Sequence, residues 1–125
     1  MPDSVTGLAH AKVNLVLEVL GLRPDGYHEI DTVLQEVELT DVVTVAASEQ
    51  WAVTATGPRS HGVPADDTNL ALKAARLLGE RVQASPVTIE LEKHIPAAGG
   101  LGGGASDAAT TLMLLAKLWP GVTAE

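Results

Sequence analysis

The sequence predicts an α+β fold in which strands come first and helices later. Apolar and polar residues alternate through much of the first half of the chain, which is typical of strands with one buried face. From residue 69 the apolar residues adopt the i, i+3, i+4 spacing of an amphipathic helix. Hydrophobic residues make up 46% of the 125 positions, so the chain can bury the core of one domain.

The expected strands lie between turn and loop signals. Residues 13–19 alternate and predict a strand, and Pro24-Asp25-Gly26 predicts a turn because Pro fixes φ and Gly accepts positive φ. Residues 29–39 are ambiguous by alternation alone, but two β-rich runs around a turn suggest a hairpin-like arrangement. Two further strands and then a loop are expected over residues 42–47, 51–56 and 57–67.

Two helices and one more strand are expected in the second half. Residues 69–82 have the apolar spacing of a helix, with an N-cap available from Asp66, Asp67 or Thr68. Residues 87–91 alternate and predict a strand. Residues 105–118 are rich in Ala and Leu and predict a helix that stops at Pro120-Gly121. Because the chain has only 2 Trp, 1 Tyr and no Phe, we expect an aliphatic core.

Composition and charge exclude several classes of site and partner. The chain has no cysteine, which excludes disulfides, thiolate metal sites and cysteine nucleophiles and is consistent with a cytoplasmic location. Its formal net charge of −8 argues against binding of a nucleic-acid backbone. No apolar run approaches the ~18–20 residues of a membrane span, and the acidic N-terminus does not resemble a signal peptide. Neither a nucleic acid nor a membrane is expected as a partner.

Five of the 12 glycines lie between the predicted strand 87–91 and the predicted helix 105–118: Gly99, Gly100, Gly102, Gly103 and Gly104. A helix N-terminus leaves unpaired N–H groups and carries the positive end of the helix dipole. Glycines before it let the backbone approach a phosphate without a Cβ in the way. Ser106 and Asp107 are candidate helix caps, and a Ser hydroxyl there can also meet a phosphate. Residues 96–108 are therefore a candidate anion cradle, and the alternative is a glycine-rich turn that binds nothing.

Two known phosphate-binding loops fit this stretch badly. A Walker A loop needs a Lys after its glycines, and none follows here. Gly100, Gly102 and Ala105 match a Rossmann fingerprint only loosely. The acidic residue expected about 20 positions further on falls at the chain end, where only Glu125 is available. A dinucleotide-binding oxidoreductase is therefore an outside alternative.

Four segments together resemble the GHMP kinase superfamily, which includes galactokinase and the homoserine, mevalonate and phosphomevalonate kinases. The stretch P-A-A-G-G-L-G-G-G-A-S-D-A at residues 96–108 is similar to the glycine loop of that superfamily. Three further segments narrow the resemblance to the members that act on 4-diphosphocytidyl-2-C-methyl-D-erythritol. They are A-K-V-N-L at 11–15, R-P-D-G-Y-H-E at 23–29 and D-T-N-L-A-L-K-A-A-R-L-L at 67–78. The similarity covers nearly the whole chain in order.

The resemblance implies an ATP-dependent kinase of the non-mevalonate isoprenoid pathway, which phosphorylates the 2-hydroxyl of this small-molecule substrate. The implied fold is that of the GHMP N-terminal domain, similar to the second domain of ribosomal protein S5, with a mixed or antiparallel sheet packed with helices. Mg²⁺ is expected to arrive with the ATP phosphates. Residues 1–125 are expected to form an incomplete N-terminal, ATP-binding domain, with the C-terminal domain and the catalytic Asp beyond Glu125. The isolated chain is then expected to transfer phosphate negligibly and to self-associate through apolar surface.

The resemblance also assigns roles to individual residues. Lys12 is the implied catalytic residue, which stabilises charge on the transferred phosphoryl group; the alternative is a strand-end Lys that reaches solvent. Asn14 follows on the same strand face and is implied to bind substrate. Tyr27 and His28 are implied to bind its cytosine by stacking and hydrogen bonding. Asn69 and Lys93 are implied to line the adenine side. From the residues alone, Asn14 looks like a solvent-facing residue, and Tyr27 and His28 look like a packed and an exposed residue of the hairpin. Asn69 looks like a helix start and Lys93 like a charge at the end of a strand.

One continuous stretch is implied to hold the ATP phosphates: Pro96, Gly99, Gly100, Leu101, Gly102, Gly103, Gly104, Ala105 and Ser106. The family usually has Ser where Ala105 stands, so one phosphate or Mg²⁺ contact is expected to be missing unless Ser106 and backbone N–H groups replace it. No metal site is expected in the chain itself, because its histidines lack ligand spacing with carboxylates. A non-catalytic nucleotide-binding remnant and another GHMP small-molecule kinase remain open as alternatives.

Overall fold

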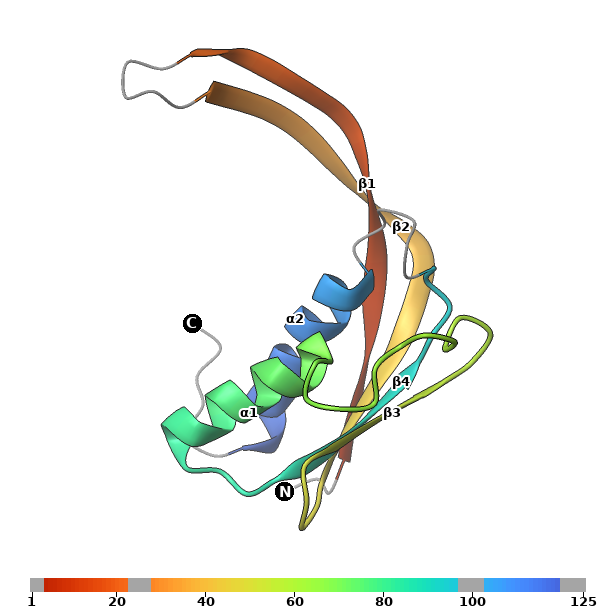
Figure 1. Ribbon diagram of the computed structural model, residues 1–125, viewed down its shortest axis with the longest axis vertical. Helices are drawn as coiled ribbons and strands as arrows, with labels where there is room; N and C mark the ends of the chain where they lie inside the picture. The colour runs from red at the N-terminus through yellow and green to blue at the C-terminus, as the bar shows by residue number, and fades with distance from the viewer. Residues whose placement is uncertain (1–3, 23–27, 97–102, 120–125) are drawn as a thin grey trace.

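The computed structural model describes residues 4–22, 28–96 and 103–119, and the side chains of these residues except 12–37 (Figure 1). The elements in chain order are β1 (Ser4–Leu22), β2 (His28–Ala47), β3 (Ala52–Thr56), α1 (Leu70–Val82), β4 (Val87–Glu92) and α2 (Gly103–Leu118). Strands precede the helices except for β4, and one sheet packs against two helices. The α+β prediction is therefore confirmed.

The four strands form one mixed sheet in the order β1-β2-β4-β3. β1 and β2 pair antiparallel, as do β2 and β4, whereas β3 and β4 pair in parallel. The parallel pair requires a crossover, and α1 lies in it between β3 and β4. Figure 1 shows both helices on the same side of the sheet. Neither helix in the described ranges has the length and apolar character needed to cross a bilayer.

The β1–β2 hairpin is much longer than the sequence predicts. β1 has 19 residues, and β2 runs for 20 residues through the two segments predicted as separate, 29–39 and 42–47. The predicted break falls at Asp41, a residue type that is depleted in strands. The strand continues through it because the Asp41 carboxylate is buried and accepts hydrogen bonds from the backbone N–H groups of His94 and Ile95. Beyond the helices, the hairpin projects as an arm (Figure 1).

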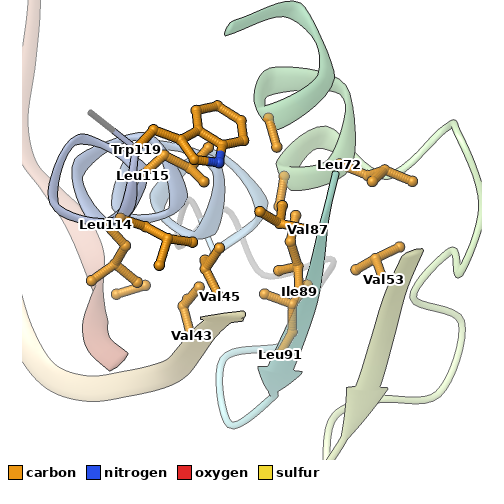
Figure 2. Packing of buried hydrophobic residues seen from close by; sticks show 14 residues of the cluster. Val43, Val45, Val53, Leu72, Val87, Ile89, Leu91, Leu114, Leu115 and Trp119 are labelled. Carbon is orange, nitrogen blue, oxygen red and sulfur yellow. The ribbon is translucent and has the colours of Figure 1, made fainter. Parts of the chain in front are cut away.

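The core is aliphatic, as the composition predicts, except for Trp119, which belongs to the same buried cluster. Figure 2 shows Val43 and Val45 of β2, Ile89 of β4 and Leu115 of α2 converging between the sheet and the helices. These four side chains have exposures of 0%. Burial of apolar surface on this scale is the main favourable contribution to folding.

Two tryptophans close one end of the helix layer. The rings of Trp51 and Trp119 lie edge to face, with centroids 6.1 Å apart. Gly79 of α1 lies directly against them, and a Cβ on this residue would lie 2.8 Å from Trp51 Cη2. A glycine in the interior of a helix usually costs stability, and here the close approach of the indole requires it.

The helix starts differ from the predicted ones. The N-cap of α1 is Asn69, whose side chain accepts from the N–H groups of Ala71 and Leu72, so the predicted caps at residues 66–68 are wrong. Asp66 instead accepts from Thr68 within the preceding loop. α2 begins at Gly103 rather than at residue 105, which places Ser106 and Asp107 inside the helix. The prediction that they cap the helix is therefore wrong, because a cap precedes the first helical residue.

Candidate functional site

A buried ion cluster lies where β2, the end of β4 and the N-terminal part of α2 meet. Lys93 Nζ donates to Asp41 Oδ2 at 2.5 Å and to Asp107 Oδ2 at 2.6 Å. The three residues, called here the Lys93 cluster, are 3%, 0% and 2% exposed for Lys93, Asp41 and Asp107. Charged residues are almost never buried this fully unless they are paired, and here each is.

The Lys93 cluster also fixes the backbone that follows β4. Asp41 Oδ1 accepts from His94 N at 2.7 Å and from Ile95 N at 2.9 Å. The Lys93 backbone N–H donates to the Thr56 carbonyl at 2.7 Å, and its carbonyl accepts from Arg59 N at 3.0 Å. The segment that leads from β4 to the glycine-rich stretch is thus attached to both β2 and the residues around the end of β3.

The pKa values of the two carboxyl groups in the Lys93 cluster are shifted in opposite directions. Burial, followed by the neighbouring Asp41 carboxylate, raises the pKa of Asp107 to about 7 against the opposing effect of Lys93. Burial also acts to raise the pKa of Asp41, but hydrogen bonds from Asp107, Lys93 and two backbone amides outweigh it and hold that pKa below 3.8. Asp107 Oδ1 is buried and has no hydrogen-bond partner among the described residues. Any proton that the two carboxyl groups share therefore belongs on Asp107, which accepts from no backbone N–H within the described part of the chain.

A cavity of about 190 Å³ adjoins the Lys93 cluster, between the start of α1 and the start of α2. Its walls include Asn69, Lys93, Gly104, Asp107 and the apolar Leu91. The structure thus brings together both residues expected on the adenine side and one residue expected at the phosphates. Apolar walls with a few fixed polar groups are typical of small-molecule sites.

The polar atoms of the two adenine-side candidates already have partners in the protein. Asn69 Oδ1 caps α1, and Asn69 Nδ2 donates to the Pro64 carbonyl at 2.9 Å. Lys93 Nζ is held between two carboxylates. The sequence alone suggests a strand-end charge at Lys93, and the structure corrects this to a buried cation because Asp41 and Asp107 compensate its charge.

The start of α2 presents part of the expected phosphate stretch. Gly103 is buried against Ile95, whereas Gly104 and Ala105 are exposed and Ser106 is half-buried. Pro96, also half-buried, precedes the stretch. The first N–H groups of a helix have no partner within it, so this end of α2 can donate to an anion. The remaining expected phosphate residues, Gly99, Gly100, Leu101 and Gly102, lie outside the described residues.

The residues expected to act on substrate lie along the β1–β2 hairpin. Lys12 pairs with Glu36 and Asn14 with Leu34, just beyond a register shift between His10 and Lys12. His28 begins β2 opposite Leu22, at the outer end of the hairpin. From His28 to Glu36 the strand covers about 26 Å at the usual rise per residue, so the described backbone does not bring His28 close to Lys12. Tyr27 and the predicted turn at residues 24–26 lie outside the described residues.

Carboxylates and histidines in the described ranges form no group of three that could hold a metal ion. His94 Nε2 lies 2.9 Å from Glu92 Oε2, but this pair is exposed and has no third ligand. The acidic residue at the start of α2, Asp107, is committed to Lys93. Asp107 therefore does not fit the role of a metal ligand.

Comparison with known sequences places the second half of the chain in a family. Residues 69–125 match the sequence model of the family described as GHMP kinases N terminal domain. The match covers α1, β4 and α2, the elements that surround the cavity. The chain has the fold of a GHMP kinase N-terminal domain.

Known proteins resemble the chain over most of its length, including the hairpin. A protein of Cereibacter sphaeroides (strain ATCC 17025 / ATH 2.4.3) is 45% identical over 111 residues, covering 89% of this chain and 38% of that protein. One of Rhodopseudomonas palustris (strain BisB18) is 48% identical over 110 residues, covering 87% of this chain and 36% of that protein. Both are named 4-diphosphocytidyl-2-C-methyl-D-erythritol kinase, which confirms the resemblance found in the motifs. The chain spans less than half the length of these two relatives.

Solved GHMP structures agree with the fold. The crystal structure of a 4-(cytidine 5'-diphospho)-2C-methyl-D-erythritol kinase superposes with a TM-score of 0.73 at 40% identity, covering 95% of this chain and 42% of that chain. A homoserine kinase from Cytophaga hutchinsonii reaches the same TM-score of 0.73 at 20% identity, covering 98% of this chain and 38% of that one. At 20% identity the second match shows the shared fold alone.

Two members of the Lys93 cluster, Asp41 and Asp107, are not predicted from the sequence as partners of Lys93. Asp41 falls at the predicted break between residues 29–39 and 42–47, and Asp107 is predicted to cap the helix instead. Their shared partner Lys93 lies 52 positions from Asp41 and 14 from Asp107. The available signal was an acidic residue in the middle of an apolar alternating run, since a charge there needs a buried partner.

Proposed function

We propose that the protein carrying this chain transfers the γ-phosphoryl group of ATP to the 2-hydroxyl of 4-diphosphocytidyl-2-C-methyl-D-erythritol. The observation that carries the proposal is the 45–48% identity to kinases named for this substrate, which extends over nearly the whole chain. Similarity to other GHMP kinases at 20% identity supports the fold but does not select their substrates.

ATP is proposed to lie across the cavity and the start of α2. The adenine would occupy the cavity beside Asn69 and Lys93, and the phosphates would accept hydrogen bonds from N–H groups at the glycine-rich stretch. Asn69 and Lys93 would shape the pocket, because their polar atoms bond within the protein. Mg²⁺ is proposed to enter with the nucleotide and to neutralise phosphate charge.

Lys12 is proposed as the catalytic residue on this chain. In phosphoryl transfer the bond between the γ-phosphorus and the ADP oxygen breaks while the acceptor hydroxyl oxygen bonds to phosphorus. An ammonium group beside the transferred group stabilises its charge. Asn14, Tyr27 and His28 are proposed to bind the substrate, with Tyr27 and His28 at the cytosine. The residue that takes the hydroxyl proton is expected beyond residue 125, in the C-terminal domain that completes the cleft.

A second candidate function is nucleotide binding without catalysis. It is favoured by the cavity beside the starts of α1 and α2, which the described residues form without a free catalytic base in its lining, since Asp107 is paired with Lys93. The expected self-association, the incomplete domain and the cytoplasmic location stay predictions.

The test uses the protein as its source makes it. Mass spectrometry gives its intact mass, and coupled ADP release is measured with 4-diphosphocytidyl-2-C-methyl-D-erythritol, with homoserine and with neither. The kinase proposal is supported by an intact mass more than twice the 12.9 kDa of this chain together with ADP release that requires 4-diphosphocytidyl-2-C-methyl-D-erythritol. ATP binding without ADP release on any acceptor supports the second candidate, and release with homoserine alone would overturn the proposed substrate.

A further inference from the structure

The glycine-rich stretch has one flank on each side of the Lys93 cluster. Chain enters the stretch through residues 93–96 after β4 and leaves it into α2 at Gly103. The two flanks fix where this stretch begins and ends, so the contacts that hold the flanks bear on the candidate phosphate site.

The entry flank is held by Asp41. The two oxygens of this buried carboxylate have different partners, since Oδ1 accepts from the backbone N–H groups of His94 and Ile95 and Oδ2 accepts from Lys93 Nζ. The Lys93 backbone is bonded on both sides, to Thr56 and to Arg59. The position of this flank is thus fixed relative to β2 and to the end of β3.

The exit flank is held by Asp107. Its Oδ2 accepts from the same Lys93 Nζ at 2.6 Å. Gly103, one turn earlier in α2, meets Ile95 so closely that a Cβ would lie 2.9 Å from Ile95 Cγ2 and 3.6 Å from Lys93 Nζ. One ammonium group and one glycine contact therefore set the separation between the two flanks.

We propose that Asp41, Lys93 and Asp107 are positioning residues that hold the two flanks of the glycine-rich stretch at a fixed separation and thereby set the affinity for the ATP phosphates. The effect on ATP rests on the proposed function; the holding of the flanks does not. None of the three has to touch the nucleotide, since each acts through backbone that it anchors. Preorganised donors bind an anion more tightly because less ordering remains to be done on binding.

A purely stabilising role explains the cluster less well. Replacing a buried ion pair by apolar side chains is often neutral or stabilising, because desolvation offsets the attraction between the charges. This cluster also leaves Asp107 Oδ1 buried and unpartnered within the described residues. A costly arrangement located at both flanks of a candidate binding stretch is better explained by the geometry that it imposes.

The test compares variants of Asp107 in the protein as its source makes it. Asp107→Ala removes the acceptor for Lys93 Nζ, whereas Asp107→Asn keeps an acceptor oxygen at that position. Val87→Ala is the matched control, because it truncates a fully buried side chain at the opposite end of β4. Two quantities are measured: the Kd for ATP by calorimetry, and the hydrogen-exchange rates of peptides covering residues 91–96 and 103–108.

We expect Asp107→Ala to raise the Kd for ATP about tenfold to a hundredfold, as loss of positioning in a site does, and to accelerate exchange in both peptides. Asp107→Asn should restore both values to near those of the unchanged protein. Val87→Ala should lower the melting temperature with little change in either value. If Asp107→Ala does not fold, Asp107→Ser takes its place, because its shorter side chain also cannot reach Lys93 Nζ.

The outcomes separate this proposal from the proposed function. If the unchanged protein binds ATP but the Ala and Val87 variants change Kd equally, the positioning role is overturned and ATP binding stands. Unaltered exchange in Asp107→Ala also overturns it. If the unchanged protein does not bind ATP, the proposed function and its phosphate site fail. In that case, faster hydrogen exchange at both flanks in Asp107→Ala, but not in Val87→Ala, still establishes that the Lys93 cluster holds the two flanks.

Discussion

Gly103 at the start of α2 packs against Ile95, which follows β4, with no room for a methyl group between them. A Cβ on Gly103 would lie 2.9 Å from Ile95 Cγ2 and 3.2 Å from Ile95 Cβ. The next residue, Gly104, is exposed, and among the described residues its Cβ would meet only Leu70 Cδ1 at 3.6 Å, an ordinary contact. Adjacent glycines in one helical turn thus serve different purposes.

Gly103→Ala should therefore destabilise the protein, whereas Gly104→Ala should not. We expect the first change to lower the free energy of unfolding by about 1–3 kcal/mol, as overpacking does. The second should leave it unchanged or raise it by up to about 1 kcal/mol, because Ala favours helix. Urea unfolding followed by circular dichroism measures both, and equal effects of the two substitutions would contradict the close packing.

Asp107 should make stability depend on pH. Because its pKa rises from 3.8 to about 7 on folding, the folded chain binds more protons than the unfolded chain between these values. The free energy of unfolding contributed by this group therefore falls as pH rises from about 4 to about 7 and is constant above that range. Asp107→Asn should remove this dependence, so its stability relative to the unchanged protein should increase between pH 5 and pH 8.

Urea unfolding of both proteins at several pH values measures this difference. Asp41 acts in the opposite direction, since its lowered pKa gives stability that is present above pH 3.8 and lost as pH falls below that value. Comparing the unchanged protein with Asp107→Asn at each pH isolates the contribution of Asp107. A difference between the two proteins that is the same at pH 5 and pH 8 would show that Asp107 does not take up a proton on folding.

Asn69 should contribute to stability as the N-cap of α1. Asn69→Ala removes the acceptor of the Ala71 and Leu72 N–H groups and should cost about 0.5–2 kcal/mol. Asn69→Asp keeps a capping oxygen but loses the donor to the Pro64 carbonyl, and should cost less. Thermal unfolding distinguishes them; an Asp variant less stable than the Ala variant would mean that the bond to Pro64, rather than the cap, is the important contact.

Lys12 should affect the chemical step more than nucleotide binding. In the protein as its source makes it, we expect Lys12→Ala to lower kcat by about 10²–10³, the usual cost of removing one stabilising group from a charged transition state. The Kd for ATP should change little. Lys117→Ala is the control, because this exposed Lys lies in the last turn of α2, far from the glycine-rich stretch. Equal rates in the two variants would exclude Lys12 from catalysis.

Local sequence patterns predicted the helices and strands with clear apolar periodicity. They failed where contacts with residues distant in the sequence determine the structure. The spacing of Leu70, Ala74 and Leu77 predicted α1, and the alternation at Val87, Ile89 and Leu91 predicted β4. The break expected at Asp41 was wrong because a charge in a strand is tolerated when a partner compensates it.

The same limitation applies to the candidate site. Spacing and glycine content predicted a candidate phosphate stretch before a helix, and a helix, α2, does begin at Gly103. They could not show that Lys93 is buried, since both of its partners come from other elements. The start of α2 is anchored by the contact of Lys93 with Asp107, and Asp41 completes the cluster. These three residues come from segments far apart in the sequence, so a short stretch of sequence cannot reveal the contact.

Trp51 and Trp119 are the 2 tryptophans of the chain and form one contact. Trp119 follows the C-terminal end of α2, about 24 Å along the helix from Gly103 at the usual rise per residue. Tryptophan fluorescence and the tryptophan bands of the near-ultraviolet dichroism therefore arise at a single place, the seam between β3, α1 and the end of α2. These signals report whether the two tryptophans pack against α1. Because ATP is proposed to bind at the other end of α2, an optical binding assay needs a dye or a labelled nucleotide.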